Sequence, residues 1–355
     1  MSQTLQPERR QAPDVPAPNH RGRGGVKLGA LLVLLLAVLA VVALLSLVYG
    51  SRAMPFGTAW ASVFDPDPSS VDQQTIRALR VPRTWLGLIA GTALGLSGAI
   101  MQGVSRNPLA DPGILGVNAG AALAVLVAIH FFGIVDLSGY VWFSFIGAGL
   151  AAVVVYAIAS IGRDGATPIK LALAGTAITA LLGSLATLMQ LLDVEAMNKF
   201  RFWVAGSLAG RDMAIVHDVW PYALVASGFA LLTGRQLNTL ALGDDVARSL
   251  GANVGRSRAW CTLWAVVLAG AATAAAGPIV FVGLTVPHIA RAVCGPDYRW
   301  ILVYSAVISP ILLVGADIVG RLVMRPNELQ VGILIALIGA PFFVALVRKR
   351  NLASL

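Results

Sequence analysis

Ten long apolar runs, separated by short polar segments, follow one another along most of the chain. Most of them have about the 20 residues that an α-helix needs to cross the hydrocarbon core of a bilayer. The pattern predicts an all-α, polytopic membrane protein with about ten transmembrane helices. The expected spans are 28–49, 84–104, 114–132, 140–161, 171–192, 219–234, 259–277, 279–294, 301–320 and 331–347.

Two of these spans are unusual. Span 279–294 is short and contains Pro287, so we expect a broken or tilted helix there, and span 301–320 carries Asp317. In span 84–104, Gly87, Gly91 and Gly95 lie four residues apart on one helical face. Small residues at this spacing allow helix backbones to approach closely in lipid. They indicate tight bundle packing and say nothing about a transported molecule.

The run 28–49 also allows a signal-peptide interpretation. The apolar region of a signal peptide is typically about 7–15 residues long, whereas this run is longer and many spans follow it. We therefore expect a retained first helix. Residues 1–25 are polar and rich in Pro, Gly and Arg, which predicts a disordered cytoplasmic tail. Residues 26–350 form the expected transmembrane domain, and 351–355 a C-terminal tail.

Lys and Arg residues are unevenly distributed between the polar segments. With the N-terminus placed in the cytoplasm, 17 of the 26 lie on the cytoplasmic side and nine on the other, as the positive-inside rule requires. An even number of spans then places both termini in the cytoplasm. The net charge of +9 is thus an orientation signal, and without a dense basic patch we expect no nucleic-acid partner.

Composition agrees with a lipid environment and points away from catalysis. Only 12% of the residues are charged, against about 25% in soluble domains. Cys261 and Cys294 belong to no metal-ligand pattern, so we expect no metal site and no cofactor. The chain has no GxxxxGK[ST], GxSxG or HExxH motif. We therefore expect no catalytic residues, and a membrane-embedded enzyme is the weakest hypothesis.

The polar segment 235–258 carries the signals of a short amphipathic helix. Asp244 is the expected N-cap, Val246 and Leu250 share a face, and Gly251 is the expected stop. One interpretation is a connector that lies on the lipid headgroups. The other is a surface helix that receives force from a soluble partner.

The segment 101–121 contains two X-Pro steps, Asn107–Pro108 and Asp111–Pro112, which force extended or turn geometry. It predicts a rigid turn between two helices, or the cytoplasmic mouth of a pore.

Three arginines are expected at the outer ends of helices. Arg80 and Arg83, in LRVPRT, are expected to be exposed, and Arg321 lies four residues after Asp317, which allows an ion pair along the helix. Each arginine can snorkel to the headgroups. Together they can attract an anionic docking partner, and the pair Asp317–Arg321 could instead belong to a proton relay.

Six blocks of the sequence, in order, resemble the FecCD-like transport system permease family. This family comprises the permease subunits of type II ABC importers for iron–siderophore complexes, haem and cobalamin. The blocks are LRVPRTWLGLIAGTALGLSGAIMQGVSRNPLADPGILGVNAGA (79–121), LALAGTAI (171–178), FWVAGSLAGRD (202–212), LNTLALGDDVARSLGANVGRSR (237–258), GPIVFVGLTVPHIAR (277–291), and GADIVGR with VGILIALIGAPFFVALVRK (315–321 and 331–349).

The resemblance implies roles for particular residues. Arg80 and Arg321 match arginines that dock the extracytoplasmic binding protein, and Asn107 and Leu109 match residues near the cytoplasmic gate. A second gate element is implied in the loop 165–170, where this chain departs from the family's Thr-Ser pair. The segment that matches the ATPase coupling helix contains Gly243, Asp244, Asp245, Arg248, Leu250 and Gly251.

The resemblance also implies an assembly. A second permease copy or a homologue, two ABC ATPase subunits that hydrolyse ATP, and a binding protein would join this chain in the cytoplasmic membrane. The expected function is import of an Fe(III)-siderophore by alternating access, with haem or cobalamin as the alternative within the family. An ion-coupled secondary transporter is the alternative outside it, and would use intramembrane ionisable residues such as Asp317 and His288.

Overall fold

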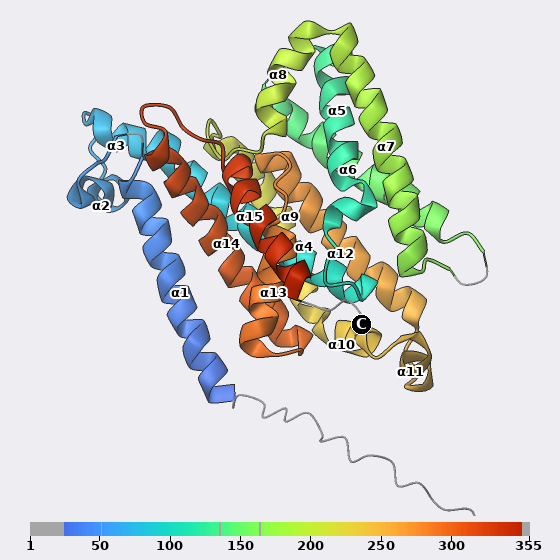
Figure 1. Ribbon diagram of the computed structural model, residues 1–355. Coiled ribbons are helices and arrows are strands. Elements are labelled where there is room, and N and C mark those ends of the chain that lie inside the picture. Colours follow the sequence, from blue (N-terminus) through green and yellow to red (C-terminus); the bar gives the residue numbers. More distant parts are fainter. Residues whose placement is uncertain (1–24, 51, 135, 163–164, 350–355) are drawn as a thin grey trace, which may run out of the picture.

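The computed structural model describes residues 25–50, 52–134, 136–162 and 165–349. Within these ranges every regular element is a helix (Figure 1), which confirms the predicted all-α class. Apart from Gly25, both predicted tails, 1–25 and 351–355, lie outside the described residues.

Ten apolar helices correspond one to one with the ten predicted spans. In the described part of the chain, seven of them are long and apolar enough to cross a membrane, and α5, α13 and α15 are shorter. The protein is thus a multi-pass membrane protein. The ten helices are α1 (Gly25–Val48), α4 (Val81–Ser105), α5 (Val117–Phe132), α6 (Leu137–Ala159), α7 (Pro168–Leu192), α9 (Met213–Leu232), α12 (Val254–Ala276), α13 (Val282–Cys294), α14 (Tyr298–Val323) and α15 (Val331–Lys349).

Short helices gather at the two ends of the bundle (Figure 1). One end, here the α8 end, carries α2 (Phe56–Phe64), α3 (Val71–Thr75), the π-helical turn η1 (Ile76–Arg80) and α8 (Val194–Val204). The opposite end, the α11 end, carries η2 (Pro112–Leu115), α10 (Gly234–Ala241) and α11 (Asp244–Ser249). These two ends hold nearly all the charged side chains discussed below.

Helix α4 is the centre of the bundle and packs against α14, α12, α13 and α9. The glycine face of α4 meets α14, as the sequence predicts. A Cβ atom on Gly91 would lie 2.5 Å from the Pro310 Cα atom, and one on Gly95 would lie 2.5 Å from the Ser305 carbonyl oxygen. Only glycine permits this approach, and the gain is van der Waals contact along both helices.

Helix α13 is short because it begins halfway along α4. A Cβ atom on Gly98 of α4 would lie 1.9 Å from the carbonyl oxygen of Gly283, in the first turn of α13. The preceding residues, 277–281, are not helical, and Gly277 at φ 77° lies against the Trp203 carbonyl. Irregular backbone at membrane depth is tolerated only where protein surrounds it, and here the bundle does so.

Candidate functional site

Helix α11 is the short surface helix that the sequence predicts, although its cap is different. The expected N-cap, Asp244, is wrong, since Gly243 occupies that position at φ 98° and Asp244 is the first helical residue. The Asp244 carboxylate therefore does not cap the helix and instead pairs with basic side chains. Gly251, at φ 81°, follows the last turn as expected. Ala247 is buried, while Val246 and Leu250 are exposed.

Asp244 joins α11 to two other parts of the bundle. Its carboxylate forms ion pairs with Arg106 at 3.1 Å and with Arg258 at 3.1 Å. Arg106 is the C-cap of α4, and Arg258 also donates to the Ala166 carbonyl oxygen at 2.9 Å. The helix, the end of α4 and the loop before α7 therefore form one connected ionic network.

The segment between α4 and α5 is the tight turn that the sequence predicts. The side-chain oxygen of Asn107 accepts a hydrogen bond from the Leu109 amide at 2.9 Å, and the Pro108 carbonyl lies 2.8 Å from His288 Nε2 on α13. Asp111 accepts from the Gly113 amide, and burial raises the pKa of its carboxyl group. The turn is thus fixed both to itself and to α13.

A buried ionic cluster lies at the α8 end. Asp317 of α14 is 1% exposed and forms ion pairs with Arg83 at 2.7 Å and with Arg321. Arg83 also pairs with Glu328 at 2.5 Å. The predicted pair Asp317–Arg321 is confirmed, but the structure adds Arg83 and Glu328 from distant parts of the sequence.

The expected exposure of Arg80 and Arg83 is wrong, since they are 7% and 8% exposed, and Arg321 is 1% exposed. Helix α1 supplies the reason for Arg80 and Arg321. The last carbonyl groups of a helix lack partners and carry partial negative charge. Arg80 donates to the carbonyls of Leu47 and Val48 at 2.7 Å each, and Arg321 to that of Ser46 at 2.9 Å. The end of α1 and the two arginines lie far apart in the sequence. Without the fold, the arginines could not be matched with that helix end.

Helix α7 presents an exposed polar face along most of its length. Its residues are largely exposed, whereas those of α4, α12 and α14 are largely buried. The helical period places a set of small and polar side chains on one side, within about 80° of arc. The set, here the α7 polar face, comprises Thr176, Thr179, Gly183, Thr187 and Gln190.

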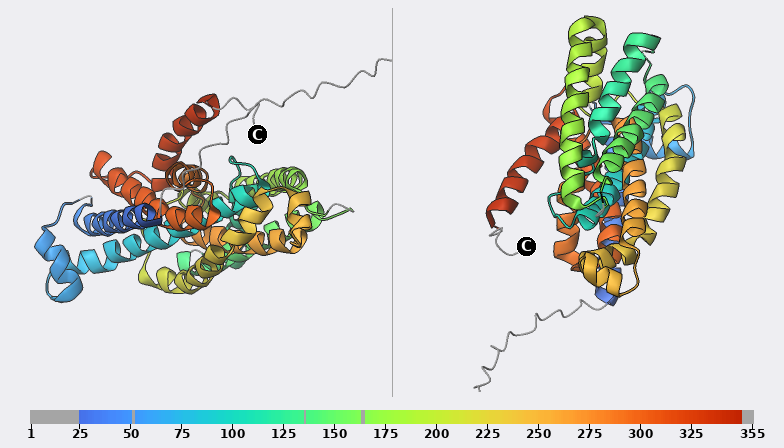
Figure 2. Two further views of the ribbon diagram at one scale, coloured as in Figure 1. Left: turned by 90° about the horizontal axis from the view of Figure 1, so that it is seen from below. Right: turned by 90° about the vertical axis from the view of Figure 1, so that its right-hand side faces the viewer.

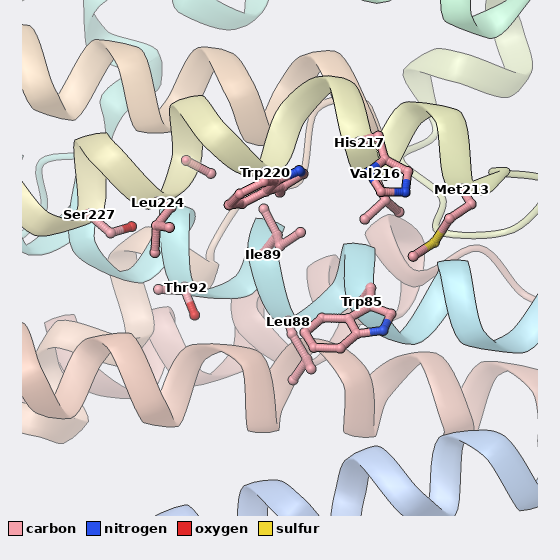
Figure 3. A pocket seen from close by; sticks show the side chains of 11 residues that line it. Trp85, Leu88, Ile89, Thr92, Met213, Val216, His217, Trp220, Leu224 and Ser227 are labelled. Atoms are coloured by element: carbon pink, nitrogen blue, oxygen red, sulfur yellow. The ribbon is translucent and has the colours of Figure 1, made fainter. Parts of the chain in front are cut away.

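Two hollows in the sides of the bundle are apolar. One, of about 470 Å³, lies between α4 and α9 and is lined by Trp85, Ile89, Trp220 and Leu224 (Figure 3). The other, of about 540 Å³, lies between α5, α6 and α7. Neither lining contains an Asp, Glu, Lys or Arg side chain. Such grooves suit lipid acyl chains and offer little to a polar ligand.

Charged and thiol groups give no sign of a metal centre. The described residues contain no group of three or more His, Cys, Asp or Glu side chains placed to hold a metal ion. Both cysteines are free.

The ten apolar helices make this protein an integral membrane protein. The chain belongs to the FecCD transport family, whose model matches residues 37–349. It is similar to the siderophore transport system permease protein YfiZ of Bacillus subtilis, with 40% identity over 321 residues, covering 90% of this chain and 95% of YfiZ.

Two further comparisons agree. The ferric enterobactin transport system permease protein FepD of Escherichia coli is 42% identical over 317 residues, covering 89% of this chain and 94% of FepD. A solved metal-chelate type ABC transporter in an inward-facing conformation has a TM-score of 0.80 and 29% identity, covering 91% of this chain and all of the other. The family is a permease component of ABC importers and not a catalytic subunit.

Proposed function

We propose that this chain is the membrane-spanning permease subunit of an ABC importer that carries an Fe(III)-siderophore across the cytoplasmic membrane by alternating access. In this assignment the α8 end faces outward and the α11 end faces the cytoplasm, with both termini inside. The names of the two relatives described above refer to a siderophore and to ferric enterobactin. Haem or cobalamin is the second candidate cargo, since the resemblance covers these as well.

The observation that carries the proposal is the α7 polar face. Thr176, Thr187 and Gln190 donate to backbone carbonyls one turn back, which satisfies these donors. The acceptor oxygens of this row are still better solvated by water than by lipid. Figure 2 shows α15 at the same edge of the bundle as α7 in its right-hand view. A second permease copy or a homologue placed against this edge would enclose a polar pathway between the two subunits.

The network around Asp244 supports a mechanical role for α11. Two ABC ATPase subunits at the α11 end would press on the exposed face of α11, where Val246 and Leu250 lie. Because Asp244 is bonded to Arg106 and Arg258, displacement of α11 would be carried to the turn at Asn107 and to the loop before α7. These are the segments in which the resemblance places the cytoplasmic gate.

The extracytoplasmic binding protein is expected to dock at the α8 end. The resemblance assigns docking to Arg80 and Arg321, but both guanidinium groups already have intramolecular partners. A docking carboxylate would have to replace the helix-end carbonyls of α1. Charge reversal at either arginine would therefore destabilise the fold as well as docking, and Arg77, which is exposed at this end, offers the cleaner test.

An ion-coupled secondary transporter is less well supported. It would need an ionisable side chain in the membrane that is free to exchange protons. Asp317 is instead engaged in ion pairs with two arginines, Arg83 and Arg321.

Reconstitution tests the proposed function. The permease, its ATPase subunits and its binding protein are placed in proteoliposomes, and uptake of labelled ferric siderophore, haem and cobalamin is measured. We expect uptake of a ferric siderophore that needs ATP and persists when ionophores collapse the ion gradients. Uptake that requires a gradient and ignores ATP would contradict the proposal.

A further inference from the structure

A polar pocket of about 320 Å³ lies at the α8 end and is distinct from the two apolar grooves. Its walls come from α8, from the loop between α8 and α9, from the start of α6 and from the residues that lead into α15. The volume is in the range of sites that bind small molecules. We call it the Arg211 pocket, after the side chain that sets its chemistry.

Three cationic side chains line the Arg211 pocket, against one carboxylate. Arg83 is already neutralised by Asp317 and Glu328, and Lys199 pairs with Glu195 at 2.6 Å on the surface. The third cation, Arg211, has no carboxylate partner among the described residues. Its Nε atom donates to the Ser207 carbonyl at 3.3 Å, and its other interaction is with the phenol of Tyr140.

Arg211 is only 8% exposed, so its charge is largely removed from bulk water. Burial lowers the pKa of the guanidinium group, because desolvation disfavours the charged form. A buried cation without an anion is unfavourable, and a ligand oxyanion would relieve that cost through charge-assisted hydrogen bonds. The guanidinium fork can bind a carboxylate through two parallel hydrogen bonds.

The rest of the lining suits the same ligand. Phe202 and Trp203 of α8 supply flat apolar walls, and Gln330 supplies an amide close to the first turn of α15. Ferric chelates with carboxylate or catecholate arms combine anionic oxygens with apolar surface. We propose that the Arg211 pocket is an entry site that binds an oxyanionic group of the incoming ferric chelate; this inference rests on the proposed function and narrows its cargo to anionic chelates.

Equilibrium binding of ferric citrate tests the pocket independently of transport. The full permease–ATPase complex in nanodiscs is titrated by calorimetry, without the binding protein. We expect Arg211→Gln to weaken binding about tenfold or more, a change of about 1.4 kcal/mol or more, and Arg211→Lys to weaken it less. Gln330→Glu, which adds a negative charge to the lining without removing a buried cation, should also weaken it.

Arg201→Gln is the matched control, because Arg201 is an exposed arginine of α8 outside the lining, over the Phe202 ring. Its affinity for ferric citrate should match that of the wild type. Unchanged binding in both Arg211→Gln and Gln330→Glu, or no binding of ferric citrate to the wild type, would overturn the proposal.

The source of the oxyanion is resolved by a second measurement. If Arg211→Gln weakens binding of the extracytoplasmic binding protein and leaves ferric citrate binding unchanged, the pocket serves docking and the assignment to cargo is wrong. A wild-type complex that takes up no ferric chelate with ATP contradicts the proposed function, whatever the pocket binds. The two proposals can thus fail separately.

Discussion

Single arginines at the α8 end illustrate how a helix end determines where charge is buried. Arg80 and Arg321 donate hydrogen bonds to carbonyl groups in the last turn of α1. These carbonyl groups would otherwise lack hydrogen-bond partners. The Asp317 carboxylate forms ion pairs with both Arg83 and Arg321. The three helices α1, α4 and α14 are therefore joined by charge as well as by packing.

We predict that Asp317→Asn destabilises the protein strongly. Removing one partner of a buried ion pair typically costs about 3–5 kcal/mol, because a charge is left without compensation. Glu328→Gln is the matched control: Glu328 pairs with the same Arg83, but its side chain is 30% exposed, and we expect a loss of about 1 kcal/mol or less. Thermal melts of the purified permease in detergent measure both, and equal melting temperatures would contradict the prediction.

At the scale of helices, close backbone contact holds the centre of the bundle together. The backbones of Gly98 in α4 and Gly283 in α13 are in contact where α13 begins. The position of the non-helical segment 277–281 depends on this close approach of the two backbones. Helix α11, at the other end, is held by the ion pairs of Asp244 and by the burial of Ala247.

We expect Gly98→Ala to disrupt the packing of α13 on α4. The new methyl group would lie 1.9 Å from a backbone carbonyl that cannot move aside without shifting the helix, and overpacking of this kind costs about 1–3 kcal/mol or more. Gly228→Ala in α9, where no atom lies within 4 Å of the added carbon, should be neutral. Monodispersity and melting temperature after detergent extraction distinguish them; a Gly98→Ala protein as stable as Gly228→Ala would refute the packing argument.

Asp244→Asn should uncouple α11 from the bundle. The variant loses a charge-assisted hydrogen bond from the buried Arg258, worth about 1.5–3 kcal/mol, and an ion pair with the more exposed Arg106, worth about 1 kcal/mol or less. Asp245→Asn is the control, since the Asp245 side chain is 99% exposed and, within the described residues, forms an ion pair with Arg248 alone. In proteoliposomes we expect Asp244→Asn to retain ATP hydrolysis and to lose most uptake, with Asp245→Asn close to the wild type. Full uptake in Asp244→Asn would exclude this route of coupling.

At the scale of the whole molecule, helix α7 has two contrasting sides. The α7 polar face comprises five residues along nearly four turns, and four of them, all but Gln190, are exposed in the described part of the chain. The opposite side of α7 is apolar and includes Leu181, which lines the groove with α5 and α6. We therefore expect the polar side of α7 to face a water-filled pathway and the apolar side to face a lipid-filled groove.

Cysteine labelling tests this distinction in membranes. In a background that lacks Cys261 and Cys294, we expect a hydrophilic maleimide to modify Thr179→Cys and Thr187→Cys, because thiols ionise and react where water reaches them. Leu181→Cys, on the opposite side of the same helix, should remain unmodified. Equal labelling at all three positions would show that the α7 polar face does not line an aqueous pathway.

The sequence by itself determined the number and order of the membrane helices, the surface helix α11 and the turn at Asn107. These features follow from local pattern: apolar length, turn residues and glycine positions act through neighbours along the chain. It also indicated the pair Asp317–Arg321, because residues four apart share a helical face.

Only the tertiary structure decided which charges are exposed and which are partners. Arg80 was expected on the surface, since its own segment contains no acceptor for it; the acceptors are carbonyls of α1, more than 30 residues away. Arg106 and Arg258 meet at Asp244, and Arg211 comes to lie in a pocket, through contacts between distant segments in the same way. A side chain's burial and electrostatic environment depend on what the fold packs against it, and the local sequence does not carry that information.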